Sequence, residues 1–151
     1  MDYFKKALDL NSNTSGVYRL MGQCYTQMKN EAKAVAAYSQ AVRINDNDAE
    51  ALSALGHLYD QRDENLEIAT LFCERSIRID PENGCYHHRL GLLYQKAERL
   101  GDALVSFENS KAHGYDSSPD LADLKALMGE ESEESEENKE SEQIQSMKIA
   151  R

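Results

Sequence analysis

A thiol and two imidazoles lie next to one another in the segment Cys85-Tyr86-His87-His88. On a helix, Cys85 and His88 are three positions apart and can share a face, which makes them candidate metal ligands. A tetrahedral zinc site needs four ligands, and the sequence has no Cys-x-x-Cys pair or second His pair to complete it. A Cys–His nucleophile pair would also need a group that orients the imidazole, which no spacing indicates. We therefore expect no metal site and interpret His87 as a core or groove histidine.

The sequence also lacks the motifs of common enzyme classes. It contains no phosphate-binding G-x-x-x-x-G-K-[ST], no dinucleotide-binding G-x-G-x-x-G and no H-E-x-x-H. Nucleophile-elbow and kinase motifs are missing as well. We therefore expect a chain that is not an enzyme and that needs no cofactor.

Composition and charge argue against further classes of protein. The 151 residues include 17 Lys and Arg against 27 Asp and Glu, a formal net charge of -10, whereas nucleic-acid-binding domains usually carry a basic excess. No run of about 18 apolar residues is present, so we expect no direct insertion into a membrane. The 3 cysteines are an odd number without a close pair, which favours reduced thiols and a cytoplasmic location. We expect protein or peptide partners and no nucleic acid.

The elements that position these side chains belong to an internal repeat of 34 or 35 residues. One marker, Gly-x-x-Tyr, begins at Gly22, Gly56 and Gly91. A second marker, Ala with a larger side chain four residues later, begins at Ala34, Ala69 and Ala103. Apolar residues recur within each unit at the three- and four-residue intervals of amphipathic helices. Glycine inside a helix costs up to about 1 kcal/mol, so its recurrence at one position of each unit indicates a packing role. We expect the small marker residues to let the two helices of a pair approach closely.

These residues resemble the tetratricopeptide-repeat (TPR) family, whose pattern is W-x2-L-G-x2-Y, followed by A-x3-F and by P. The resemblance implies an all-α fold, a right-handed α-solenoid of antiparallel helix pairs. It assigns full repeats to residues 15–48, 49–83 and 84–117. Because such arrays present a concave surface to a partner, the resemblance also implies a binding function.

The two ends of the chain differ from a full repeat. Residues 1–14 resemble the second helix of an incomplete repeat, whose uncovered apolar stripe is explained by a longer array or by pairing with another copy. Residues 118–129 are expected to form a C-terminal capping helix that starts with Ser118 as its N-cap. Its inward-facing residues are expected to be Leu121, Leu124 and Leu127. Residues 130–151 are predicted to be an acidic, disordered tail, because residues 130–142 contain eight Glu and one Lys.

In the TPR family the first helix of each repeat lines the inner groove, and the resemblance assigns groove residues here by register. The expected peptide-binding residues are Arg19, Gln23, Gln27, Ser53, His57, Gln61, His88, Arg89, Gln95 and Lys96. Among them, Arg19, Arg89 and Lys96 are expected to anchor acidic residues of a ligand, and the Gln side chains to form adaptable hydrogen bonds.

A chaperone-binding clamp is not expected in this groove. The clamp with which some TPR proteins grip a C-terminal carboxylate uses Lys, Asn, Asn, Lys and Arg, and this chain has Ala54 and Cys85 at two of those positions. An Asn ladder that would hold an extended peptide backbone is missing too, since Leu20, Ala54 and Arg89 stand at its positions. Recognition is therefore expected to depend on side chains.

These expectations favour a non-catalytic adaptor or scaffold that binds a peptide segment of a partner protein, with self-assembly through the N-terminal end as an additional expectation. Two alternatives stay open. A more apolar groove would favour a chaperone that shelters a secretion substrate or a membrane-protein segment. A longer reading frame would favour a regulatory segment of a larger enzyme.

Overall fold

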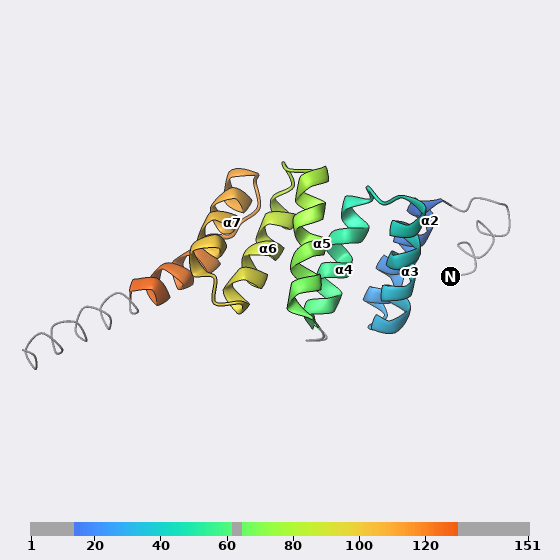
Figure 1. Ribbon diagram of the computed structural model, residues 1–151, viewed down its shortest axis with the longest axis horizontal. Helices are drawn as coiled ribbons and strands as arrows, with labels where there is room; N and C mark the ends of the chain where they lie inside the picture. Colours follow the sequence, from blue (N-terminus) through green and yellow to red (C-terminus); the bar gives the residue numbers. More distant parts are fainter. Residues whose placement is uncertain (1–13, 62–64, 130–151) are drawn as a thin grey trace, which may run out of the picture.

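The computed structural model describes residues 14–61 and 65–129, in which helices and short turns occur but no β-strand (Figure 1). In chain order the helices are α2 (Ser15–Gln27), α3 (Glu31–Ile44), α4 (Ala49–Gln61), α5 (Leu66–Ile79), α6 (Gly84–Lys96) and α7 (Leu100–Ala112). Residues 118–129 are also helical. Apart from Thr14, the predicted incomplete repeat lies outside the described residues, and so does the predicted acidic tail.

The helices pack in successive pairs. The most extensive contacts join α2 to α3, α4 to α5 and α6 to α7, and neighbouring pairs meet through α3 with α4 and α5 with α6. Figure 1 shows the pairs in one row along the longest axis. The described part of the chain is therefore an all-α solenoid of helix pairs, as the repeat predicts. None of its helices has the length and apolar character needed to cross a bilayer.

The two sequence markers are the two sides of one contact between paired helices. A Cβ on Gly22 would stand 2.7 Å from the ring of Tyr38, and one on Gly91 would stand 2.6 Å from the ring of Phe107. Real Cβ atoms do not approach ring atoms so closely in a close-packed core, so a larger residue would separate the helices. The alanine markers are fully buried at Ala34, Ala69 and Ala103. The recurrence of both markers thus follows from the packing of each pair.

The C-terminal helix begins one residue earlier than expected. The N–H of Leu121 donates to the carbonyl of Ser117 (3.0 Å), which makes Ser117 the N-cap in place of Ser118. The Ser117 hydroxyl is buried and donates to Oγ of Ser110 at 2.7 Å, so it ties the helix to α7. The proline after Ser118 pointed to Ser118 as the cap, whereas the burial of Ser117 against Ser110, which selects the cap, is a tertiary contact.

The inward face of this helix also differs from the expected one. Leu121 and Leu124 are buried as predicted, but Leu127 is 40% exposed, and Met128 packs against the core around α7 instead. A residue seven positions after Leu121 returns to the same face of a helix, whereas one six positions later is rotated away from it. The apolar stripe therefore runs through Met128.

Candidate peptide-binding face

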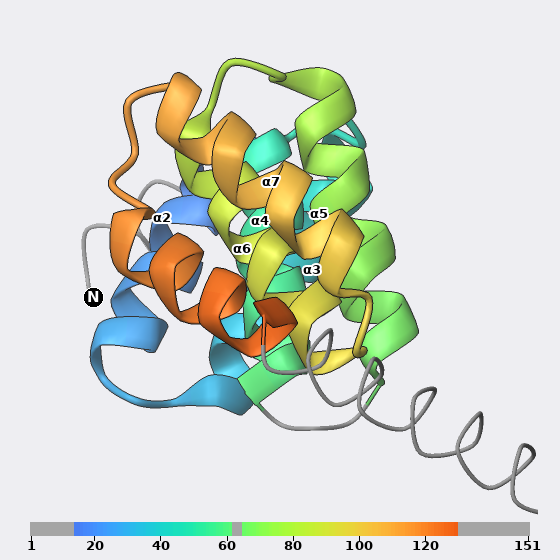
Figure 2. The ribbon, with the colours of Figure 1, turned by 90° about the vertical axis from the view of Figure 1, so that its left-hand side faces the viewer.

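The first helices of the pairs lie together on one side of the solenoid. Seen along the row, α2, α4 and α6 form one layer and α3, α5 and α7 the other (Figure 2). Helices α4 and α6 are in direct contact across the repeat boundary. All ten side chains predicted for the groove come from these three helices. We refer to the layer of α2, α4 and α6 as the first-helix face.

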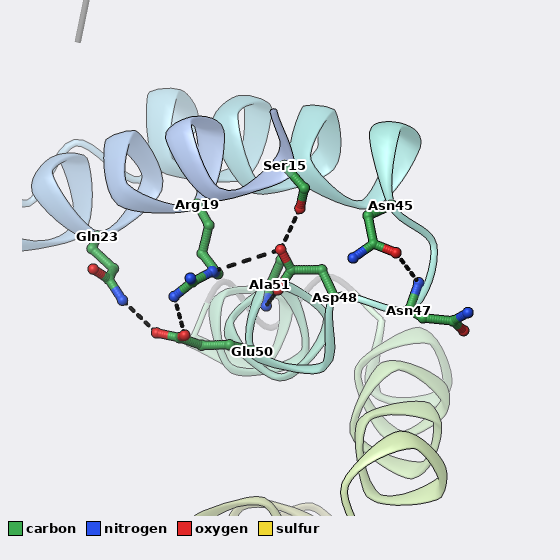
Figure 3. Close-up of polar contacts among 8 residues, drawn as sticks. All are labelled: Ser15, Arg19, Gln23, Asn45, Asn47, Asp48, Glu50 and Ala51. Atoms are coloured by element: carbon green, nitrogen blue, oxygen red, sulfur yellow. Dashed lines mark hydrogen bonds and ion pairs between the residues drawn. The ribbon is translucent and has the colours of Figure 1, made fainter. Parts of the chain in front are cut away.

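Polar side chains bridge α2 and α4 on this face (Figure 3). Arg19 forms an ion pair with Glu50, and Gln23 donates a hydrogen bond to the other carboxylate oxygen of Glu50. Nε of Arg19 also lies 3.6 Å from Oδ2 of Asp48, which accepts a hydrogen bond from the Ser15 hydroxyl. The charge of Arg19 is therefore already balanced within the protein.

A second bridge joins α4 and α6, where Nζ of Lys96 lies 3.0 Å from a carboxylate oxygen of Asp60. A third joins α6 to the C-terminal helix, where Nε2 of His88 lies 3.1 Å from Oδ2 of Asp120. Partners in the Arg19, Lys96 and His88 bridges are 31, 36 and 32 residues apart in the sequence, which is close to one repeat. A polar partner about one repeat away, earlier or later in the chain, is thus the sequence signal that could have identified them. These bridges join side chains at nearby, not identical, positions of adjacent repeats.

Arg89 differs from the other cations of the first-helix face. Its Nη1 donates to Oγ of Ser53 at 2.6 Å, a neutral partner. Among residues 14–61 and 65–129, no carboxylate lies within ion-pair distance of Arg89. Ser53 itself is fully buried, so it holds Arg89 from beneath the surface and is not placed to contact a ligand.

The surroundings of Arg89 form a shallow hollow of only about 10 Å³. His57 and Arg89 line it together with Asp60 and Leu92, between α4 and α6. Burial, and after it the positive charge of Arg89, lower the pKa of His57, which therefore stays uncharged at neutral pH. The other charged residue that lines the hollow, Asp60, pairs with Lys96. Arg89 therefore supplies the positive charge of the hollow.

The remaining predicted groove residues lie toward the carboxyl ends of their helices. Gln27 and Gln61 are exposed at the last positions of α2 and α4, and Gln95 is half-buried near the end of α6. The structure thus brings His57 and Arg89 together at one hollow and places these three amides at one end of the layer. Their role as ligand contacts stays a prediction.

The thiol and the two imidazoles of residues 85–88 do not form one cluster, because the two histidines make different structural contacts. His87 is buried, its Nε2 lies 2.7 Å from the carbonyl oxygen of Pro81, and its ring stacks on His113 at 5.4 Å. His88 instead contacts Asp120, and Cys85 is half-buried. Within the described residues, no group of three or more His, Cys, Asp and Glu is placed to hold a metal ion.

Cys73 is expected to resist thiol reagents in the native protein. It is fully buried, and burial raises the pKa of its thiol to about 12, so the reactive thiolate is not formed at neutral pH. Cys24 and Cys85 are half-buried and should react first. Counting alkylated cysteines by mass spectrometry, with and without denaturant, tests this order. Modification of Cys73 at the rate of Cys24 in the folded chain would contradict it.

The same pKa predicts a loss of stability at alkaline pH. Both folded and unfolded chains hold the Cys73 proton below the ordinary thiol pKa of 9.0. Above that pH the unfolded chain releases the proton while the folded chain keeps it until about pH 12. The contribution of Cys73 to stability therefore falls as pH rises through this interval. A Cys73→Ala variant should lose this part of the alkaline dependence in urea unfolding.

Comparison with known proteins supports the repeat and the fold. Residues 22–61 match the family model described as TPR repeat. No curated protein sequence matches the chain. The fold is similar to the first TPR of Spaghetti (RPAP3) bound to HSP90 peptide SRMEEVD, with a TM-score of 0.72 and 12% identity over 77% of this chain and 96% of that one. It is also similar to the crystal structure of MamA, with a TM-score of 0.66 and 23% identity over 74% of this chain; this chain spans 65% of the MamA chain.

The matched segment runs from the first Gly-x-x-Tyr marker to the end of α4 and includes the Ala34 marker. Both markers recur in the helix pairs that follow, with the same close contact between paired helices. This recurrence, the family match over residues 22–61 and the solenoid fold agree: the matched segment is a TPR repeat, and the described part of the chain has the fold of a TPR solenoid.

Proposed function

We propose that this chain is a non-catalytic adaptor whose first-helix face binds an acidic peptide segment of a partner protein. The proposal rests on one observation: the guanidinium of Arg89 has no carboxylate partner among the described residues. Arg89 lies at the hollow between α4 and α6 and is held in place by Ser53. A ligand carboxylate would supply a charge-assisted hydrogen bond that the protein itself does not provide there.

The similar fold of RPAP3 supports an acidic ligand. The peptide named with that structure, SRMEEVD, carries three acidic residues, so a solenoid of this kind can hold such a segment. This chain has Ala54 and Cys85 where the chaperone clamp has polar groups. We therefore infer a preference for an acidic peptide of another sequence.

Selection from a random peptide display library tests the proposal. The full chain is expected to enrich peptides with Asp or Glu, and a parallel selection on an Arg89→Gln variant should lose that enrichment. The uncharged variant keeps a hydrogen-bond donor for Ser53, which makes it a matched control. Equal enrichment of acidic residues on both proteins, or enrichment of uncharged apolar peptides, would contradict the proposal.

Self-assembly through the N-terminal end is a second part of the proposal. In the middle pair, Leu52 and Leu55 are buried, and Leu55 belongs to the core cluster around α3. Their counterparts Tyr18 and Met21 are only half-buried and line an apolar hollow of about 280 Å³ between α2 and α3. A helix of a second copy would cover this hollow as a preceding helix covers it in later repeats.

Light scattering over a concentration series measures this association. The mass of the full chain is expected to rise with concentration, and Ala36→Glu should suppress the rise because Ala36 lines the hollow. Ala32→Glu is the matched control, since Ala32 is also exposed on α3 but does not line the hollow. A constant monomer mass, or equal suppression by both variants, would contradict assembly through this end.

A further inference from the structure

A cleft of about 660 Å³ lies between α5 and the turn that joins α6 to α7. It contains none of the ten residues predicted for the groove. One wall is a stripe of α5 in which Leu66, Thr70 and Glu74 follow one another at four-residue intervals, and the other includes Tyr94 and Arg99. Its volume is within the range of sites that hold ligands in other proteins.

The α5 wall of the cleft carries a polar residue at a position where the other two pairs have an aliphatic one. By the repeat register, Thr70 corresponds to Val35 and Leu104, which pack against the cores of the other two pairs. Thr70 instead directs its hydroxyl back to the carbonyl of Leu66 at 2.8 Å. Threonine has the size of valine, so the middle pair differs here by a polar, internally bonded side chain that lines the cleft.

The wall opposite α5 is fixed by hydrogen bonds. The hydroxyl of Tyr94 donates to Oε1 of Glu74 at 2.8 Å, and the guanidinium of Arg99 lies 4.3 Å from the centre of the Tyr94 ring. The backbone N–H of Arg99 donates to the carbonyl of Tyr94 at 2.9 Å. Burial and the contact with Glu74 raise the pKa of Tyr94 to about 12, so the donor persists at neutral pH. The cleft is therefore formed before any ligand arrives.

Its uncompensated charge is negative. The charge of Arg99 is balanced by Asp102, whose Oδ2 lies 2.6 Å from Nη2. Glu74 meets the neutral hydroxyl of Tyr94, and Glu67 has no cation within ion-pair distance in the part of the chain that the structure describes. Next to these carboxylates, Leu71 is 55% exposed. Two carboxylates thus adjoin an exposed apolar side chain.

We propose that this cleft is a second protein-binding site, which holds a partner segment that carries an arginine or a lysine beside an aliphatic residue. The hydrocarbon stem of the basic side chain packs on Leu66 and Leu71, and its charged end pairs with Glu67 and Glu74. Long basic side chains combine these two properties in one residue. Because the cleft shares no residue with the predicted groove, one chain can hold two partners at once.

NMR titration of the full chain with a defined probe tests the second site. The probe is the peptide Ac-Ala-Leu-Arg-Leu-Ala-NH2, and saturable shifts of the Thr70, Leu71 and Ala97 amides are expected at millimolar concentration. Replacing the probe's arginine with norleucine keeps the stem and removes the charge, which should weaken binding about tenfold. A probe with glutamate at that position should leave these amides unshifted.

Two variants separate this site from the first-helix face. Glu67→Gln with Glu74→Gln should weaken binding of the arginine probe about tenfold, and glutamine keeps an acceptor for the Tyr94 hydroxyl so that the fold is preserved. Arg89→Glu should leave the probe's affinity unchanged. The proposal is overturned if the cleft amides do not shift, if the norleucine probe binds equally well, or if the shifts follow Arg89 instead of the two glutamates.

Discussion

Gly56→Leu is expected to destabilise the chain strongly, because no side chain fits at this position. A Cβ on residue 56 would lie 2.6 Å from Sγ of Cys73 and 2.9 Å from the carbonyl oxygen of Ala69. The carbonyl belongs to the backbone of α5 and cannot rotate away, so α4 and α5 must separate. Overpacking of this kind typically costs about 1–3 kcal/mol, and leucine brings three further carbon atoms. Urea unfolding followed by circular dichroism should show a lower midpoint and reduced helicity.

Two further variants distinguish overpacking from the loss of glycine as such. Gly101→Ala adds the same Cβ to α7, where no other atom lies within 4 Å, and should be neutral or stabilising by up to about 1 kcal/mol. Cys73→Ala should relieve part of the cost of Gly56→Ala, because it removes Sγ while the Ala69 carbonyl stays in place. A Gly56→Leu protein as stable as the unmodified chain would refute the packing argument.

Arg89→Glu is expected to weaken the binding of a selected acidic peptide by about tenfold to a hundredfold. The change removes a hydrogen bond to a charged group, worth about 1.5–3 kcal/mol, and adds a repulsive carboxylate. Ser53 is neutral, so replacing Arg89 removes no ion pair from the part of the chain that the structure describes. Fluorescence anisotropy with a labelled peptide gives the affinity, and circular dichroism shows whether the variant is folded.

Arg19 provides the comparison for Arg89. Its charge is shared with Glu50 and Asp48, so a ligand must compete with carboxylates that are already in place. Arg19→Gln should therefore change affinity much less than Arg89→Gln, and stability by at most about 1 kcal/mol, as is usual for a partly exposed ion pair. The double variant Arg19→Glu with Arg89→Glu should abolish binding without unfolding the array. If Arg19→Gln and Arg89→Gln reduce the affinity for the peptide equally, the proposal that Arg89 is the main anchor is wrong.

Much of the fold could be predicted because the residues that pack the paired helices recur at a fixed interval in the sequence. The Gly-x-x-Tyr and Ala markers recur at 34 or 35 residues, and each records a close contact that every pair makes. Helix ends were also readable where a breaker is present: α5 ends at Ile79, directly before Asp80 and Pro81. The start of the C-terminal helix was misplaced by one residue, because Ser117 and Ser118 are chemically equivalent until one of them is buried against Ser110.

The candidate site was less predictable than the fold. Register placed Arg19, Arg89 and Lys96 on one face, but it assigned all three the same role. The structure shows that Arg19 and Lys96 meet carboxylates of the adjacent repeat, whereas among the described residues Arg89 meets a buried hydroxyl and no carboxylate. Whether a charge is balanced depends on side-chain rotamers and on the angle between repeats, neither of which a one-dimensional pattern contains.

The sequence by itself determined the class of this protein: an all-α array of paired helices with the repeat pattern of TPR proteins. Helix periodicity and small residues at fixed spacing suffice for that conclusion, because they govern contacts within one pair. Only the tertiary structure decided which charges pair across repeats, and that a cleft lies between α5 and the α6–α7 turn. These features arise from contacts between residues from different pairs, whose distances are set by the stacking of the pairs.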